Sequence, residues 1–293
     1  MKNRPARRHQ ARLLLPELAQ LEKRLGPEDP IGLTKEQAHH IVRVLRLGVG
    51  DRIELLDGRG GCYLSCIASL QHDKLDLRCL ADHFVPPSRL QLQLMQGLSA
   101  ADHMDFSLQK GVELGLNVFT PVACERSVSR IDPTRAATKQ KHWHGVAQAA
   151  CMQSSNPWLP VIHPPQSLSQ ALQDIALRTD DVAAEQSPEK KTRHLWMLDP
   201  YSSESLSDTL HQASARPAQA KVDIVLLVGP EAGLSEDEVH QAHQAGFLSV
   251  HLGPRTLRTE TAALAAIASI QSTWGDWHQT ASRWDPGVSR PRT

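Results

Sequence analysis

The chain has 293 residues with 32 basic and 32 acidic side chains, so its formal net charge at pH 7 is zero and suggests no particular partner. Hydrophobic residues make up 40% and charged residues 22%, which excludes a chain that is disordered throughout. Its length is about twice that of a typical domain, which favours two domains. No apolar stretch approaches the roughly 20 residues of a membrane helix, and residues 13–15 are too short for a secretory signal, so we expect a cytoplasmic protein.

The cysteines give no sign of a disulfide framework or a metal centre. There are five, scattered between positions 62 and 151, and an odd count suits reduced thiols. Cys62 and Cys66 lie near His72, but no second paired set follows. We predict no metal site.

The first 14 residues form a basic arm with five Lys or Arg and no acidic residue. Its arginines Arg7, Arg8 and Arg12 are candidates for contacts with nucleic-acid phosphates. A solvated chain terminus explains the same pattern, and the residues alone leave both interpretations open.

Helical spacing predicts a helix over 35–45, with Thr34 as its N-cap. Strands are predicted at 52–56, 62–68 and 74–80, separated by glycine-rich or polar turns that are typical of a small antiparallel sheet or barrel. Pro86 and Pro87 then interrupt the chain, because proline neither continues a helix nor pairs in a central strand. We therefore place the first domain at 1–86.

After this boundary, strands alternate with helices, which predicts an α/β domain with a parallel sheet over 87–277. A polar stretch at about 178–194 is interpreted as a loop that interrupts the sheet, and 278–293 as a tail. The predicted strands are 90–96, 117–124, 195–198, 222–228 and 249–252, and the predicted helices are 103–114, 134–153 and 259–274.

Two glycine-proline loops follow successive strands of this domain. Gly229-Pro230 ends an apolar strand, and Ser235 with Glu238 forms a capping box for the next helix. The second loop, 252–261, contains two arginines, a glutamate and three threonines. Ligands of open α/β sheets bind outside the carboxyl ends of the strands, so both loops are candidate sites. Neither has the glycine spacing of a Rossmann or P-loop motif.

The segments GPEAGLSEDE (229–238) and LGPRTLRTETAALAAIASIQSTWGD (252–276) resemble the last third of the small-subunit ribosomal RNA uridine N3-methyltransferases, a family of the knotted SPOUT superfamily. HHIVRVLRL (39–47) resembles the N-terminal RNA-binding motif of that family. MDFSLQKGVELG (104–115) resembles the helix that opens its catalytic domain. The resemblance thus extends over most of the chain.

This resemblance implies an N-terminal PUA-like β-barrel, a C-terminal domain with a trefoil knot, a homodimer, and S-adenosylmethionine as methyl donor. The implied substrate is one uridine of 16S ribosomal RNA, alone or in the small ribosomal subunit, methylated at N3. The residues carried over as cofactor-binding are Gly229, Pro230, Glu231, Leu252, Gly253, Pro254 and Leu257.

Methylation at N3 requires loss of the N3 proton and stabilisation of the developing uracil anion. At the start of the last helix, Arg258 is assigned to the uracil or a phosphate, and Glu260 to base or positioning duty. A pairing between the two, with Glu260 favouring the helix dipole, is the structural alternative. Arg43 and Arg46 are three residues apart and are expected to share a helix face, forming with the basic arm a surface for ribosomal RNA.

Three positions depart from the family pattern. Met152 stands where a glutamate is expected, Asn156 where an arginine is expected, and Ala232 where a second glycine is expected. Two other functions therefore stay open: a SPOUT methyltransferase for another RNA position, and a non-catalytic RNA-binding or ribosome-assembly protein. The intact 252–261 loop argues against the second.

Overall fold

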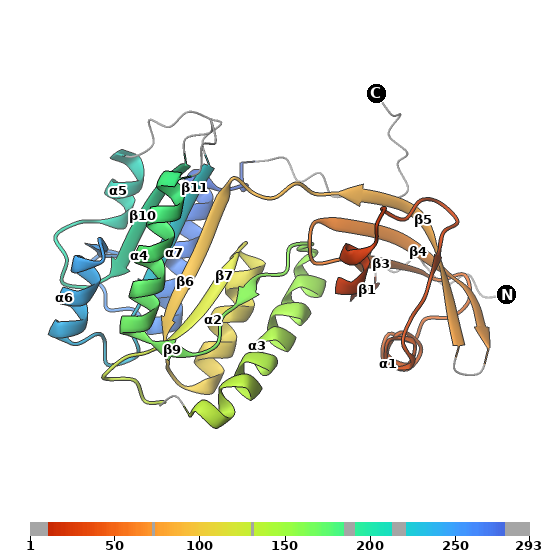
Figure 1. Cartoon of the computed structure of the whole chain (residues 1–293), viewed down its shortest axis with the longest axis horizontal. Coiled ribbons are helices and arrows are strands. Elements are labelled where there is room, and N and C mark those ends of the chain that lie inside the picture. Colours follow the sequence, from red (N-terminus) through yellow and green to blue (C-terminus); the bar gives the residue numbers. More distant parts are fainter. Residues whose placement is uncertain (1–10, 72–73, 130–131, 185–190, 213–220, 279–293) are drawn as a thin grey trace. The chain divides into compact units, whose positions relative to one another are not determined.

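The computed structural model describes residues 11–71, 74–129, 132–184, 191–212 and 221–278 (Figure 1). Its contacts divide the chain into two compact units. Of the described residues, the first unit contains those up to Pro87 together with Cys151–Leu159, and the second contains Ser88–Ala150 and those from Pro160 to position 278. The return of nine residues to the first unit is not indicated by the sequence.

The first unit is built on a five-stranded sheet of order β1-β3-β4-β5-β2. The three predicted strands form, and two of them are longer than expected because β4 and β5 pair along almost their whole length. Strand β1 runs parallel to β3, and the other pairs are antiparallel. The strands are β1 (Ala11–Leu14), β2 (Pro30–Ile31), β3 (Arg52–Leu56), β4 (Gly61–Gln71) and β5 (Lys74–Phe84), with a 3-10 turn at Pro16–Gln20.

The helix predicted over 35–45 begins as expected but changes form halfway. Thr34 caps α1 (Lys35–His39) in a capping box, and a π-helical turn follows at His40–Val44. Arg46 lies beyond this turn in a left-handed conformation, with φ of 56°. The prediction that Arg43 and Arg46 share a helix face is therefore wrong. The reason is tertiary, since Leu45 and Leu47 turn back to pack on the core of the unit.

The second unit has a parallel sheet of order β12-β10-β11-β6-β7-β8, with β9 also pairing with β7. Seven of the eight residues of β11 are buried or half-buried, as expected for a central parallel strand covered on both faces. The strands are β6 (Leu90–Gly97), β7 (Val118–Ala123), β8 (Val161–Ile162), β9 (Gln166–Ser167), β10 (Lys191–Leu198), β11 (Lys221–Val228) and β12 (Leu248–Val250).

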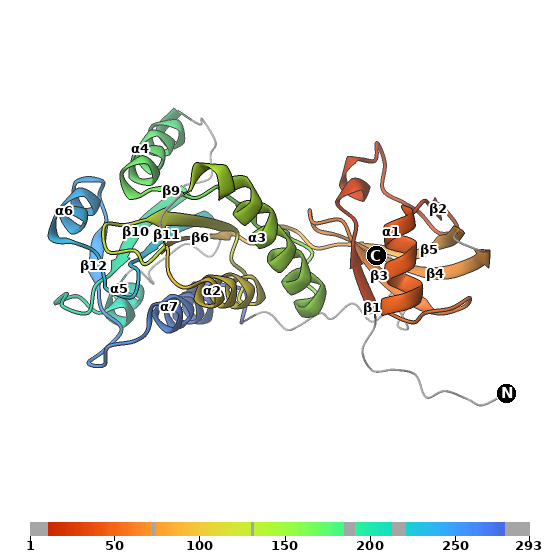
Figure 2. The same cartoon turned by 90° about the horizontal axis from the view of Figure 1, so that it is seen from below.

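Helices cover both faces of this sheet (Figure 2). One face carries α2 (Ala101–Glu113), α5 (Leu206–Gln212) and α7 (Thr259–Trp274), and the other carries α3 (Pro133–Ser154), α4 (Leu168–Ala184) and α6 (Glu236–Gln244). The α/β class and the parallel sheet are confirmed, and α7 has the bounds that the sequence predicts.

The polar loop predicted at about 178–194 is mostly regular structure. Helix α4 continues to Ala184 and β10 begins at Lys191, which leaves only 185–190, outside the described residues. Polar composition misled the prediction. The first turns of α4 are stabilised by packing of their apolar face on the core, and the helix then continues into the polar segment because adding residues to an existing helix is favourable. From Lys191 onward, pairing with β11 establishes the strand. Of the predicted tail, all but position 278 lies outside the described residues.

Candidate functional site

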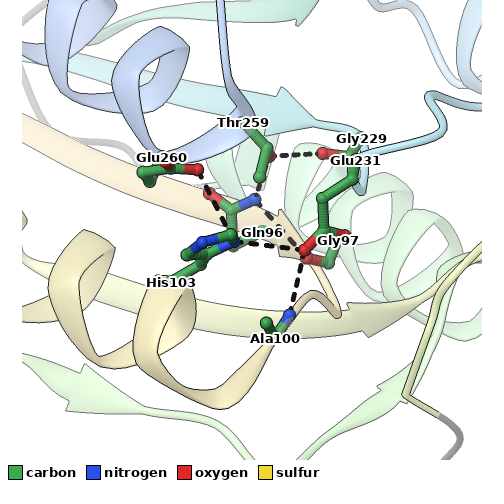
Figure 3. A network of polar contacts seen from close by, with 8 residues as sticks. All are labelled: Gln96, Gly97, Ala100, His103, Gly229, Glu231, Thr259 and Glu260. Atoms are coloured by element: carbon green, nitrogen blue, oxygen red, sulfur yellow. Dashed lines mark hydrogen bonds and ion pairs between the residues drawn. The ribbon is translucent and has the colours of Figure 1, made fainter.

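Three chain segments meet at the carboxyl edge of the parallel sheet (Figure 3). The ends of β6 and β11 are neighbours, because Gln96 pairs with Val228. The Thr259 hydroxyl at the start of α7 donates to the Gly229 carbonyl at 2.6 Å and accepts from the buried Gln96 amide at 2.8 Å. These bonds join the first glycine-proline loop to the helix that follows the second.

Gly97 allows β6 and the first loop to approach closely. A Cβ atom at this position would lie 2.4 Å from the Pro230 nitrogen and 2.7 Å from the Gly229 carbonyl carbon. Both neighbours are backbone atoms, so no side-chain rotation would relieve the contact. Gly97 was not among the predicted site residues, because only the pairing of β6 with β11 brings it there.

Hydrogen bonds from neighbouring residues fix the C-terminal end of the first loop. Ser235 and Glu238 form the predicted capping box of α6, and Glu238 also accepts a hydrogen bond from the Glu125 amide after β7. Arg126 donates to the Leu234 carbonyl at 3.2 Å. The left-handed residue of the loop is Gly233, with φ of 73°, whereas Ala232 is not among the residues with positive φ. The substitution at position 232 is therefore compatible with the backbone of this loop.

Glu231, a predicted cofactor-binding residue, bridges the first loop to α2. Its Oε1 accepts from the Ala100 amide at 3.0 Å and lies 3.2 Å from Nδ1 of His103. Burial alone would raise the pKa of Glu231, but the hydrogen bonds from Ala100 and His103 outweigh it and hold the pKa below its ordinary value. The carboxylate is thus ionised at neutral pH.

The second loop presents a half-buried apolar pair next to a glycine in the left-handed conformation. Gly253 has a φ of 96°, and its amide donates to the His251 ring. Leu252 and Leu257 are half-buried, whereas Pro254 is exposed. Partly exposed leucines beside accessible backbone suit a planar ligand with polar edges, such as an adenine.

The two predicted catalytic residues have different environments. Arg258 is the N-cap of α7, and its exposed side chain makes no hydrogen bond or ion pair with any residue that the structure describes. Glu260 is 9% exposed, and its Oε2 has no hydrogen-bond partner in the described part of the chain, although it lies 3.8 Å from Nδ1 of His103. The alternative pairing of Arg258 with Glu260 is not observed.

The predicted RNA-contact residues that the structure describes have different environments. Arg43 and Arg46 are exposed, whereas Arg7 and Arg8 lie outside the described residues. Arg12 is in β1, where it forms an ion pair with Glu54 and donates to the Met152 carbonyl. Its guanidinium is therefore already engaged in holding the first unit together.

The departures at positions 152 and 156 belong to the packing of the first unit. Met152 packs on its core, and the Asn156 side chain accepts from the Trp158 amide. The Trp158 ring packs edge-on against Phe84, and its indole nitrogen donates to the Val85 carbonyl. These contacts give both residues a structural role.

Neither a metal centre nor a membrane span is found among the described residues. They contain no cluster of three or more His, Cys, Asp or Glu that could hold a metal ion. Within the same ranges, no helix is long and apolar enough to cross a membrane.

Known proteins resemble this chain along most of its length. A family profile described as an RNA methyltransferase domain matches residues 86–271, and one described as an RNA methyltransferase PUA domain matches residues 33–79. Ribosomal RNA small subunit methyltransferase E of Bacillus subtilis is 30% identical over 256 residues, which cover 86% of this chain and 93% of the relative. The protein of the same name from Synechocystis is 31% identical over 246 residues, or 84% and 74% of the two chains.

Solved structures agree with these matches. Ribosomal RNA small subunit methyltransferase E from Neisseria gonorrhoeae, bound to S-adenosyl methionine, aligns with a TM-score of 0.73 and 31% identity over 92% of this chain and 100% of that one. A methyltransferase from Legionella pneumophila, also with bound cofactor, aligns with a TM-score of 0.72 and 28% identity over 90% and 98% of the two chains.

Proposed function

This chain belongs to the RNA methyltransferase family that includes ribosomal RNA small subunit methyltransferase E, and we propose that it methylates N3 of one uridine in 16S ribosomal RNA. It is an RNA methyltransferase with a PUA-like N-terminal domain, and its methyl donor is S-adenosylmethionine. The observation that carries the proposal is the convergence of both glycine-proline loops and the start of α7 at one sheet edge, all within the matched residues 86–271.

The residues at this edge fit the cofactor. Gly229, Pro230 and Glu231 supply backbone groups and a fixed carboxylate, while Leu252 and Leu257 offer a slot for the adenine, flanked by Gly253 and Pro254. The buried Gln96 Oε1 has no hydrogen-bond partner among the described residues and is available to a donor. When bound, S-adenosylmethionine supplies an electrophilic methyl group on a positively charged sulfur.

Arg258 and Glu260 provide opposite charges at the N-terminus of α7. The exposed guanidinium of Arg258 is available to a uracil oxygen or a phosphate, and its planar donors suit the anion that develops when N3 loses its proton. Glu260, two residues further along the chain, is buried and contributes negative charge to the site, either as the base or as a positioning group.

Ribosomal RNA is the partner, and we assign Arg43 and Arg46 of the first unit to its phosphates. Arg7, Arg8 and Arg12 complete the proposed basic surface, with Arg12 contributing less because Glu54 neutralises it. We further propose a homodimer that acts in the cytoplasm, and a trefoil knot in the second unit, as the family resemblance implies.

Modification mapping tests this function directly. Ribosomal RNA from cells with and without the gene is digested and analysed by mass spectrometry, and the unmodified RNA or subunit is then incubated with purified protein and labelled S-adenosylmethionine. We expect 3-methyluridine at one position of the small-subunit RNA, restored by the protein in vitro. A methyl group on another nucleotide would favour the alternative RNA position, and RNA binding without methylation would favour an assembly factor.

A further inference from the structure

His103 lies at the point where the first loop, α2 and α7 meet (Figure 3). No sequence motif singles it out. We propose that Nε2 of His103 is the base that accepts the proton of uridine N3, with Glu231 orienting the ring. This inference rests on the proposed function and deepens it by naming the proton acceptor.

The position of the ring hydrogen follows from the neighbours of Nδ1. This nitrogen lies 3.2 Å from Oε1 of Glu231 and 3.8 Å from Oε2 of Glu260. An ionised carboxylate only accepts hydrogen bonds, so Nδ1 carries the hydrogen and donates it to Glu231. The neutral ring then has its lone pair on Nε2. A carboxylate that accepts from Nδ1 and leaves Nε2 free to take a proton also orients the histidine of Ser-His-Asp triads.

Nε2 is accessible to a substrate. It makes no hydrogen bond to any residue in the described part of the chain, and the His103 side chain is 29% exposed. Glu231 is itself held by the Ala100 amide and belongs to the loop that we assign to the cofactor. The same carboxylate therefore ties the orientation of the base to the position of the cofactor loop.

Carboxylates from two different elements lie close to the His103 ring. The ring is on the third residue of α2. Once protonated, the ring faces Glu231 from the first loop and Glu260 from α7, and the nearby acids of its own helix are Asp102 and Asp105. Imidazole is also intrinsically a stronger base than a carboxylate. Glu260 is therefore a positioning residue that stabilises the imidazolium.

The step balances as a proton transfer coupled to methyl transfer. The N3–H bond of the uracil breaks and its proton goes to Nε2, while the N3 electron pair forms the new bond to the methyl carbon. The bond between that carbon and sulfur breaks with its electrons remaining on sulfur. The products are 3-methyluridine and S-adenosylhomocysteine, and the imidazolium then releases its proton to water.

The first test does not depend on activity. Nitrogen NMR of protein labelled with 15N-histidine reports which ring nitrogen carries the hydrogen, and the signal of His103 is identified by its loss in His103→Gln. We expect the Nδ1–H form at neutral pH, and a shift toward a mixture of forms in Glu231→Gln. An Nε2–H form in the unmodified protein would overturn the proposal, because that nitrogen then has no lone pair for the proton.

The second test is kinetic. In single-turnover methylation at pH 7, we expect His103→Gln to lose about a hundredfold or more in rate, the lower end of general-base effects, with S-adenosylmethionine affinity unchanged. The loss should shrink as pH rises, since uridine then loses its proton without help, and added imidazole should partly rescue His103→Ala. His142→Gln is the matched control, because His142 is an exposed histidine paired with Asp105 on the surface of the same unit.

The outcomes separate this inference from the proposed function. If the unmodified protein makes no 3-methyluridine, the proposed function fails. If it makes 3-methyluridine and His103→Gln keeps the same rate and pH profile, only the assignment of His103 fails. A large loss with a changed profile in Glu260→Gln, without one in His103→Gln, would make Glu260 the base. Loss of cofactor affinity in a folded His103→Gln would show that His103 positions the first loop and would overturn its assignment as the base.

Discussion

Arg46 combines an exposed charge with an unfavourable backbone conformation. Its φ of 56° is in the left-handed region, which costs a residue with a side chain roughly 1–2 kcal/mol and usually favours glycine. The Leu47 amide closes the turn by donating to the Ile41 carbonyl. A charged residue at this position is unnecessary for the turn, which supports a role for its guanidinium outside the fold.

Arg46→Gly separates these two roles. We expect the free energy of unfolding to stay unchanged or rise by up to about 1 kcal/mol, because glycine adopts this conformation without strain. RNA binding should weaken, and the slope of log affinity against log salt should fall by about one. Arg46→Ala is the control, since it removes the same charge and keeps the strain. A wild-type salt slope in both variants would leave Arg46 without an RNA contact.

Arg258 offers the sharpest test of the catalytic assignment at the residue scale. Its side chain is exposed and makes no bond within the described residues, so Arg258→Ala should fold normally. We expect turnover to fall by on the order of a hundredfold or more while calorimetry shows near-normal cofactor affinity. Arg258→Lys should recover little, because an ammonium cannot reproduce a planar pair of donors. Full activity of the alanine variant would exclude Arg258 from the site.

At the scale of elements, the site depends on the close packing of β6 against the first loop. The Gln96 side chain, the Thr259 hydroxyl and the Gly229 carbonyl form a continuous chain of hydrogen bonds. Gly97 adjoins this chain without room for a Cβ atom. The position of the loop is therefore determined by backbone contact with the neighbouring strand.

Gly97→Ala should displace that loop. Its Cβ would overlap the backbone of Gly229 and Pro230, so we expect at least a tenfold loss of S-adenosylmethionine affinity by calorimetry and a lower melting temperature. Gly145→Ala is the control. Gly145 lies in α3, where a Cβ atom would meet no atom of another element within 4 Å, and alanine there should stabilise the helix by roughly 0.5–1 kcal/mol. Unchanged affinity in Gly97→Ala would show that the packing does not determine the cofactor site.

At the scale of the whole molecule, the reactivity of the cysteines can show whether the two units unfold separately, because both units contain buried thiols. Burial is the main cause that raises the pKa of Cys62, Cys124 and Cys151 to about 12 and that of Cys79 to about 11. These thiols are protonated and buried at neutral pH, so they are unreactive until the surrounding structure opens. Cys66 is half-buried and lies in β4.

Pulsed alkylation along a urea series should follow this division. We expect Cys66 to react first in the native protein at pH 8. Cys151 should then become reactive together with Cys62 and Cys79, because residues 151–159 belong to the first unit. Mass spectrometry of the labelled peptides measures the order. If Cys151 instead follows Cys124, the end of α3 is stabilised by the second unit.

Much of the fold can be predicted from local patterns, which do not depend on residues distant in the sequence. The capping boxes at Thr34 and Ser235 and the bounds of α7 follow from residues a few positions apart. Where the structure departs from prediction, distant contacts dominate: pairing with β11 makes a strand of the polar start of β10, and Arg12 is engaged by Glu54.

The same distinction applies to the site. By itself, the sequence determined the α/β class, the two glycine-proline loops, and the candidates Arg258, Glu260 and Glu231, since each belongs to a contiguous motif. Only the tertiary structure brought Gln96, Gly97 and His103 to these loops, because the parallel pairing of β6 with β11 joins residues more than 120 positions apart. No local pattern records such a contact, since parallel strands meet only after the chain between them has folded.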